Sequence, residues 1–206
     1  MKNIFVAIVA TCLLGGYSES AQAQGQSPND VVQQAADALA VALDGRKAEL
    51  TADKDALYAL VDEILLPNFD RRYAAQLVLG RHWRNASEEQ RDEFIDAFYF
   101  SLLREYGEGV LQFNQDSMEI LPFRGDTSKG RATVKTIVKL DDGTEVPVHY
   151  GVVQRDAGWL LFDVTIEGIS YIRNFRTQLN SEVQAKGLPA VIARLQGEQN
   201  PTSAAE

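Results

Sequence analysis

The apolar residues in the first half of the chain recur at helical spacing. Val31, Ala35, Leu39 and Leu43 follow this spacing directly after Ser-Pro-Asn-Asp at 27–30, a run typical of a helix N-terminus. Two further sets of apolar residues at helical spacing end before a proline at 67 and a glycine at 80. The pattern predicts four helices, at about 28–44, 57–66, 69–79 and 88–106.

The helix predicted at 88–106 has the clearest boundaries and the widest apolar face. Ser87 and Gln90 match a capping box, in which each side chain accepts a hydrogen bond from the other residue's backbone amide. Its apolar side is rich in aromatic residues, while charged residues occupy the opposite side. Aromatic stripes of this kind usually pack in a core, so the stripe alone does not predict a cavity.

Beyond Gly109 the period changes from helical to alternating. Apolar residues alternate around 118–120, 132–138 and 146–152, and an apolar run at 159–166 follows; turn sequences at 141–143 and 156–158 separate the longer segments. Helices are then predicted from Ile169 and over 188–195, before a polar tail. The chain is therefore expected to form one α+β domain, with an antiparallel, twisted sheet of about four strands and helices packed on one face.

The N-terminus has the features of an export signal. Lys2 precedes an apolar stretch from 4 to 14, and Ala-Gln-Ala at 21–23 fits the site that signal peptidase recognises. The stretch is shorter than the roughly 20 residues that span a bilayer. We expect a signal peptide at 1–23, a folded domain at 24–196 and a flexible tail at 197–206; lipoprotein processing at Cys12 is the alternative.

Composition and charge exclude several classes of function. The 206 residues are 45% hydrophobic, with 20 Lys and Arg against 29 Asp and Glu, so the net charge of −9 gives no basic surface for nucleic acid. A single Cys and 2 His make a metal centre improbable, so no metal site and no cofactor are predicted. No nucleophile, nucleotide-binding or metalloprotease motif occurs.

Asp163 is the one candidate for catalysis. It lies in an apolar strand, where an acid with a raised pKa would act as a base, as in isomerases on cone-shaped α+β folds. A structural, hydrogen-bonded carboxylate is the simpler interpretation. We therefore predict no catalytic residue and no enzyme activity, with a small-molecule isomerase or hydrolase as the alternative function.

Several blocks of sequence, taken in order, resemble the MlaC family, also called the Ttg2D or toluene-tolerance family. The longest block is LGRHWRNASEEQR at 79–91 with Phe94 and Phe98, where the family usually has Ala-Thr-Pro at 86–88. The resemblance extends from the first predicted helix to Leu195. The other blocks are Val146-Pro147-Val148 with Tyr150, Gly158-Trp159 with Phe162-Asp163-Val164, Ile166-Glu167-Gly168-Ile169-Ser170 with Asn174-Phe175-Arg176, and Gly187-Leu188.

The resemblance implies a monomeric periplasmic carrier whose cargo is phospholipid. It implies partners at both membranes, namely an outer-membrane lipoprotein complex and an inner-membrane ABC transporter with an MCE-domain subunit, and a role in outer-membrane lipid asymmetry. Both acyl chains would lie in an apolar pocket between sheet and helices, with the headgroup near solvent. A pocket that holds only the tails predicts broad headgroup specificity.

Combined with the hydrophobic pattern, the resemblance gives a hypothesis for the residues of the site. Arg84 and Arg176 are the candidates for contact with the lipid phosphate at the mouth. If the apolar stripes instead close on one another, the protein is a periplasmic interaction module with a filled core. The residues predicted to line the lipid pocket are Phe94, Phe98, Leu102, Tyr106, Val134, Val138, Val148, Tyr150, Val152, Phe162, Val164, Ile169, Ile172 and Phe175.

Overall fold

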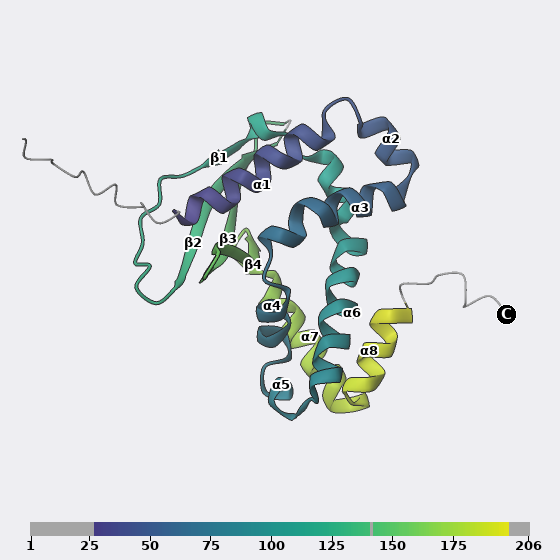
Figure 1. Cartoon of the computed structure of the whole chain (residues 1–206). Helices are drawn as coiled ribbons and strands as arrows, with labels where there is room; N and C mark the ends of the chain where they lie inside the picture. The colour runs from purple at the N-terminus through teal and green to yellow at the C-terminus, as the bar shows by residue number, and fades with distance from the viewer. Residues whose placement is uncertain (1–26, 141, 198–206) are drawn as a thin grey trace, which may run out of the picture.

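The structure, a computed structural model, describes residues 27–140 and 142–197 (Figure 1). The predicted signal peptide with Cys12, and residues 198–206 of the predicted tail, lie outside this range. The helices are α1 (Pro28–Leu43), α2 (Lys47–Ala52), α3 (Lys54–Leu65), α4 (Arg71–Leu79), α5 (Arg81–Asn85), α6 (Glu88–Tyr106), α7 (Tyr171–Lys186) and α8 (Leu188–Gly197). The short 3₁₀ helices are η1 (Leu66–Asn68), η2 (Gly107–Gln112) and η3 (Gln115–Ser117).

Local sequence signals fix the starts of α1 and α6. The Ser27 and Asp30 side chains form a capping box at α1, and those of Ser87 and Gln90 form another at α6, with both hydrogen bonds 3.1 Å long in the second case. Each box satisfies backbone N–H groups that the first helical turn leaves without partners. The predicted bounds of α6 are confirmed.

The sheet has five strands rather than about four. They are β1 (Met118–Ile120), β2 (Arg131–Lys139), β3 (Glu145–Arg155), β4 (Gly158–Ile166) and β5 (Ile169–Ser170), and they form an antiparallel meander in the order β1-β2-β3-β4-β5. The additional strand is β5, whose two residues are too few to give an alternating pattern. The helix predicted from Ile169 therefore begins at Tyr171.

One helix packs across one face of the sheet. Helix α1 runs across β2, β3 and β4, as Figure 1 shows. Its Val31 and Val32 pack against Val134, Val152 and other buried strand residues. Helix α1 thus lies on one face of the twisted sheet, as predicted for the helices.

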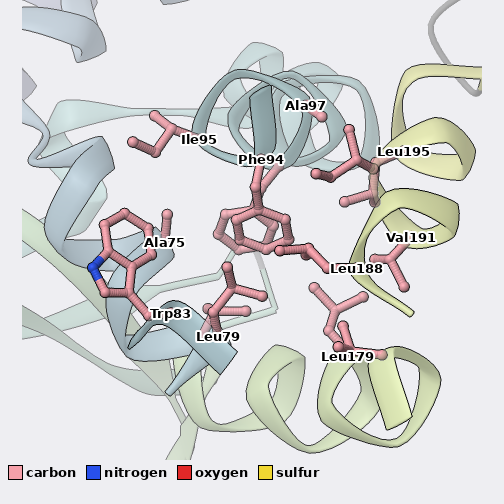
Figure 2. Packing of buried hydrophobic residues seen from close by; sticks show 14 of the residues in the cluster. Ala75, Leu79, Trp83, Phe94, Ile95, Ala97, Leu179, Leu188, Val191 and Leu195 are labelled. Carbon is pink, nitrogen blue, oxygen red and sulfur yellow. The ribbon is translucent and has the colours of Figure 1, made fainter. Parts of the chain in front are cut away.

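The remaining helices build a second core beyond the end of the sheet. Helices α4, α5, α6, α7 and α8 enclose Phe94, which is fully buried in the centre of this cluster (Figure 2). Helix α8 folds back on α6 and brings Leu188, Val191 and Leu195 to the Phe94 side. We call this cluster the helical core.

Short helices are the other departure from the predicted fold. Helix α2 has no recognisable periodic signal in its six residues, and α5 lies between the helices predicted at 69–79 and 88–106, where no helix was predicted. Within 27–140 and 142–197, no helix is both long enough and apolar enough to cross a membrane.

Candidate functional site

An apolar cavity of about 290 Å³ lies where the sheet, α3, α6 and α7 meet. Its volume is near the lower end of the range of roughly 300–1,000 Å³ that is usual for ligand sites. The lining residues are Val61, Leu65, Phe69, Tyr99, Leu102, Leu103, Tyr106, Gly107, Val110, Phe162, Asp163, Val164, Ile166, Tyr171, Ile172 and Phe175. Nearly all of these side chains are apolar or aromatic, so the cavity suits a hydrocarbon ligand.

A bulge in β4 explains how consecutive strand residues reach the same cavity. Asp163 is opposite Gly151, but Leu161 is already opposite Val152, so Phe162 has no partner on β3. A β-bulge of this kind redirects a side chain. A Cβ on Gly151 would lie only 3.0 Å from the Phe162 ring and 3.1 Å from the Asp163 Cβ, so a side chain at 151 would force these neighbours to shift.

Asp163 is the one charged side chain among the lining residues that the structure describes. Its carboxylate accepts hydrogen bonds from Ser170 Oγ at 2.6 Å and from the backbone N–H of Ile172 at 3.1 Å. Both carboxylate oxygens therefore accept hydrogen bonds from groups at the start of α7. This geometry matches the structural carboxylate that was the simpler interpretation of the sequence.

Two tyrosines contribute polar groups at the cavity wall. The Tyr99 hydroxyl donates to Asp62 Oδ1 at 2.8 Å, and burial together with this hydrogen bond raises the pKa of Tyr99. The Tyr106 hydroxyl donates to Glu105 at 2.8 Å, and loss of solvation raises its pKa as well. Both hydroxyls remain protonated at neutral pH, so they add no charge to the cavity.

The cavity meets solvent at Tyr106. This residue is 40% exposed, whereas the other lining residues are buried or half-buried. Its ring makes an edge contact with Tyr171, with centroids 5.1 Å apart, and a longer contact with Phe175. We define the mouth of the cavity by Tyr106 and Tyr171.

A charged groove adjoins the cavity, and Phe69 lines both. Three arginines of the groove each face a carboxylate, and these ion pairs are Arg71–Asp96 at 3.1 Å, Arg72–Asp92 at 3.1 Å and Arg155–Asp70 at 2.7 Å. Positive and negative groups thus balance in the groove. It offers no excess of positive charge to a phosphate.

Six of the fourteen predicted pocket residues line the cavity. They are Leu102, Tyr106, Phe162, Val164, Ile172 and Phe175. These residues come from the second half of α6, from β4 and from the start of α7, which together form one wall of the cavity. Contact of these residues with lipid stays a prediction.

The other eight predicted residues do not line the cavity. Phe94 and Phe98 are buried in the helical core. Val134, Tyr150 and Val152 pack under α1, which occupies that part of the sheet face. Val138 lies opposite Met118 of β1, and Val148 lies opposite Thr136. Ile169 is 62% exposed on β5.

Neither arginine predicted to hold the phosphate lines the cavity. Arg84 is exposed on α5, at the end of the helical core (Figure 1). Arg176 is exposed on α7, and its guanidinium lies against Gly80, 3.0 Å from the position of a Cβ there. Contact of Arg84 and Arg176 with the lipid phosphate stays a prediction, and neither residue belongs to the mouth defined by Tyr106 and Tyr171.

The sequence contained a signal for some of the lining residues that were missed. Val61 and Leu65 belong to the apolar stripe of the predicted helix at 57–66, and Tyr99 and Leu103 belong to that of α6. Val110 lies in η2, for which no periodic signal exists. Among the described residues, no three His, Cys, Asp or Glu side chains converge as metal ligands would.

Comparisons with known proteins agree in pointing to one family. The family model described as MlaC protein matches residues 33–197. The chain is 29% identical to the toluene tolerance protein Ttg2D of Pseudomonas putida, over 79% of this chain and 75% of that protein. It is 22% identical to the intermembrane phospholipid transport system binding protein MlaC of Haemophilus influenzae, over 82% and 81%.

A solved structure shares the fold. It is that of a phospholipid-binding protein from Ralstonia solanacearum in complex with a phospholipid, with a TM-score of 0.76 and 22% sequence identity. The match covers 84% of this chain and 96% of that one. The α+β arrangement described above is therefore that of a known lipid-binding protein.

Proposed function

Since the chain belongs to the MlaC family, we propose that it is a phospholipid carrier whose cavity takes the acyl chains. The observation that carries the proposal is the apolar cavity between β4, α6 and α7, which opens at Tyr106. Lipid tails bring no polar groups that need partners, and this cavity wall offers almost none. The names of the relatives and the lipid in the Ralstonia structure support the same cargo.

The energetics of lipid transfer explain why such a carrier is needed. Exposing a buried CH₂ group to water costs about 0.8 kcal/mol, so two long tails cost upward of roughly 20 kcal/mol. Lipid therefore crosses an aqueous compartment very slowly without a carrier. An apolar cavity exchanges one hydrocarbon environment for another and removes most of this barrier.

We further propose that the protein works in the periplasm, between an outer-membrane lipoprotein complex and an inner-membrane ABC transporter with an MCE-domain subunit. The signal sequence expected at 1–23 and the transport-system name of the Haemophilus relative support this placement. Such transfer would maintain outer-membrane lipid asymmetry. The net charge of −9 would repel anionic membrane surfaces, so loading would depend on docking to proteins.

We do not propose catalysis. Asp163 is the one acid that the sequence offered as a base, and both of its carboxylate oxygens already accept hydrogen bonds. No observation in the site favours the isomerase or hydrolase alternative.

The test is extraction of the purified protein with organic solvent, followed by mass spectrometry of the extract. We expect phospholipid in stoichiometric amounts, with no strong headgroup preference. The variant Leu102→Glu places a charge in the cavity wall and should lose the lipid, while Val41→Glu, at a residue that is 78% exposed on α1, should keep it. Wild-type protein without phospholipid, or equal retention by both variants, would refute the carrier function.

A further inference from the structure

Helix α7 forms one wall of the cavity, and a short connection through β5 joins its start to the sheet. Tyr171, Ile172 and Phe175 line the cavity from the first turns of this helix. Two residue pairs, Thr165 with Ser170 and Ile166 with Ile169, join β4 to β5 just before it. The tight turn at Glu167 and Gly168, both with positive φ, comes between these strands.

Asp163 adds a direct link from the middle of β4 to the beginning of α7. Its carboxylate accepts the Ser170 hydroxyl at 2.6 Å and the N–H of Ile172 at 3.1 Å. The same Ser170 oxygen accepts the N–H of Arg173 at 3.2 Å, so the two side chains together cap the helix. Ser170 is 5% exposed, which shields this group of hydrogen bonds from water.

A carboxylate in an apolar wall is costly unless its oxygens have partners. Here the donors are fixed in place by the helix, and the N-terminal end of a 16-residue helix carries a partial positive charge that favours an anion. The arrangement stabilises the carboxylate only while α7 keeps this position. The same hydrogen bonds therefore hold the helix against the cavity.

We propose that Asp163 is a positioning residue for lipid retention: through Ser170 and Ile172 it holds the start of α7 as a cavity wall, and it thereby sets how fast a bound lipid leaves. This proposal rests on the carrier function proposed above. It assigns no contact between Asp163 and the lipid headgroup. Its role is to keep Ile172 and Phe175 in place.

The test compares two substitutions at Asp163 with a helix cap elsewhere. Asp163→Ala removes both acceptors, whereas Asp163→Asn keeps an oxygen for the Ile172 amide and gains an N–H that the Ser170 oxygen can accept. Ser87→Ala removes the corresponding cap of α6, at the end of that helix away from the cavity, and serves as the matched control. The proteins are loaded with deuterated dipalmitoyl phosphatidylethanolamine, and its transfer to phosphatidylcholine vesicles is followed by mass spectrometry.

We expect Asp163→Ala to release the lipid roughly tenfold faster than wild type, because two donors of α7 lose their partner. Asp163→Asn should remain within about twofold of wild type, and Ser87→Ala should be destabilised without faster release. Backbone hydrogen exchange should rise at residues 171–175 in Asp163→Ala and stay unchanged in α8. Unchanged release from Asp163→Ala, or equal acceleration in Ser87→Ala, would overturn the proposal.

Two other outcomes, a variant that does not fold and a wild-type protein that takes up no lipid, can be told apart from failure of this proposal. If Asp163→Ala does not fold, Ser170→Ala removes one of the two hydrogen bonds to the carboxylate and should give an intermediate acceleration; no acceleration would overturn the proposal. If wild-type protein takes up no phospholipid, the carrier function fails. Hydrogen exchange at 171–175 then still decides whether Asp163 holds α7 in place.

Discussion

The two halves of α6 have the same kind of apolar side chains and opposite structural roles. In the first half, Phe94 and Phe98 stack with ring centroids 5.6 Å apart and are almost completely buried in the helical core. In the second half, Leu102 and Tyr106 line the cavity. The two halves differ in the elements that pack against them. Residues of α8 fill the space around Phe94 in the first half.

Phe175 marks the boundary between these two regions. Its ring makes an edge contact with Phe98 on the side of the helical core, at a centroid distance of 5.3 Å, and it also lines the cavity. Closure of an apolar face by a neighbouring element thus decides whether aromatic residues form a core or a binding site. Their chemistry alone does not.

The largest effect should follow from a substitution in the filled half. Phe94→Ala leaves a void among tightly packed residues and should lower the free energy of unfolding by about 3–5 kcal/mol. Leu102→Ala enlarges a cavity that already exists, so its cost should be nearer 1 kcal/mol. Urea denaturation of both variants measures the two costs. Equal losses would mean that the two halves of α6 do not differ as described.

The sequence predicted α6 itself but not the different packing of its two halves. The spacing of apolar residues and the capping box at Ser87 predicted α6 with its correct bounds. Whether the Phe94 side is filled depends on α8, about ninety residues further along the chain. Hydrophobic periodicity describes one element at a time and contains no information on which distant element will cover it.

The same limit applies to the sheet. Alternation predicted β2 and β3, and an apolar run predicted β4. The pattern could not show that α1 covers Val134, Tyr150 and Val152, so these residues were assigned to the pocket. The bulge that brings Phe162 and Asp163 to the cavity is a matter of register between two strands. Single-strand patterns do not reveal register shifts.

A smaller effect should come from the ion pair that ties α8 to α7. Arg194 donates to both carboxylate oxygens of Glu182, at 2.9 and 2.8 Å, and this pairing lowers the pKa of Glu182. A lowered folded-state pKa stabilises the protein above the unfolded value of about 4.3 and loses that contribution as pH falls through the folded value. Glu182→Gln should therefore cost about 0.5–1 kcal/mol at neutral pH.

The pH dependence distinguishes this ion pair from general acid unfolding. The difference in unfolding free energy between wild type and Glu182→Gln should shrink as the pH falls from the unfolded value of about 4.3 through the lowered folded value, because Glu182 becomes protonated in the folded state only there. Glu93→Gln, at an exposed carboxylate of α6, is the control and should show a smaller difference. A Glu182→Gln effect that does not change with pH would contradict the role of the ion pair.

The smallest effect should come from the two arginines that the sequence placed at the mouth. Arg84 and Arg176 lie outside the cavity, so Arg84→Ala and Arg176→Ala should each change the unfolding free energy by no more than about 0.5 kcal/mol. Lipid transfer to vesicles should also stay at the wild-type rate, because neither arginine lines the cavity. A severalfold change in that rate for either variant, with stability unchanged, would show that the lipid leaves past the helical core and would reverse the roles assigned to the two halves of α6.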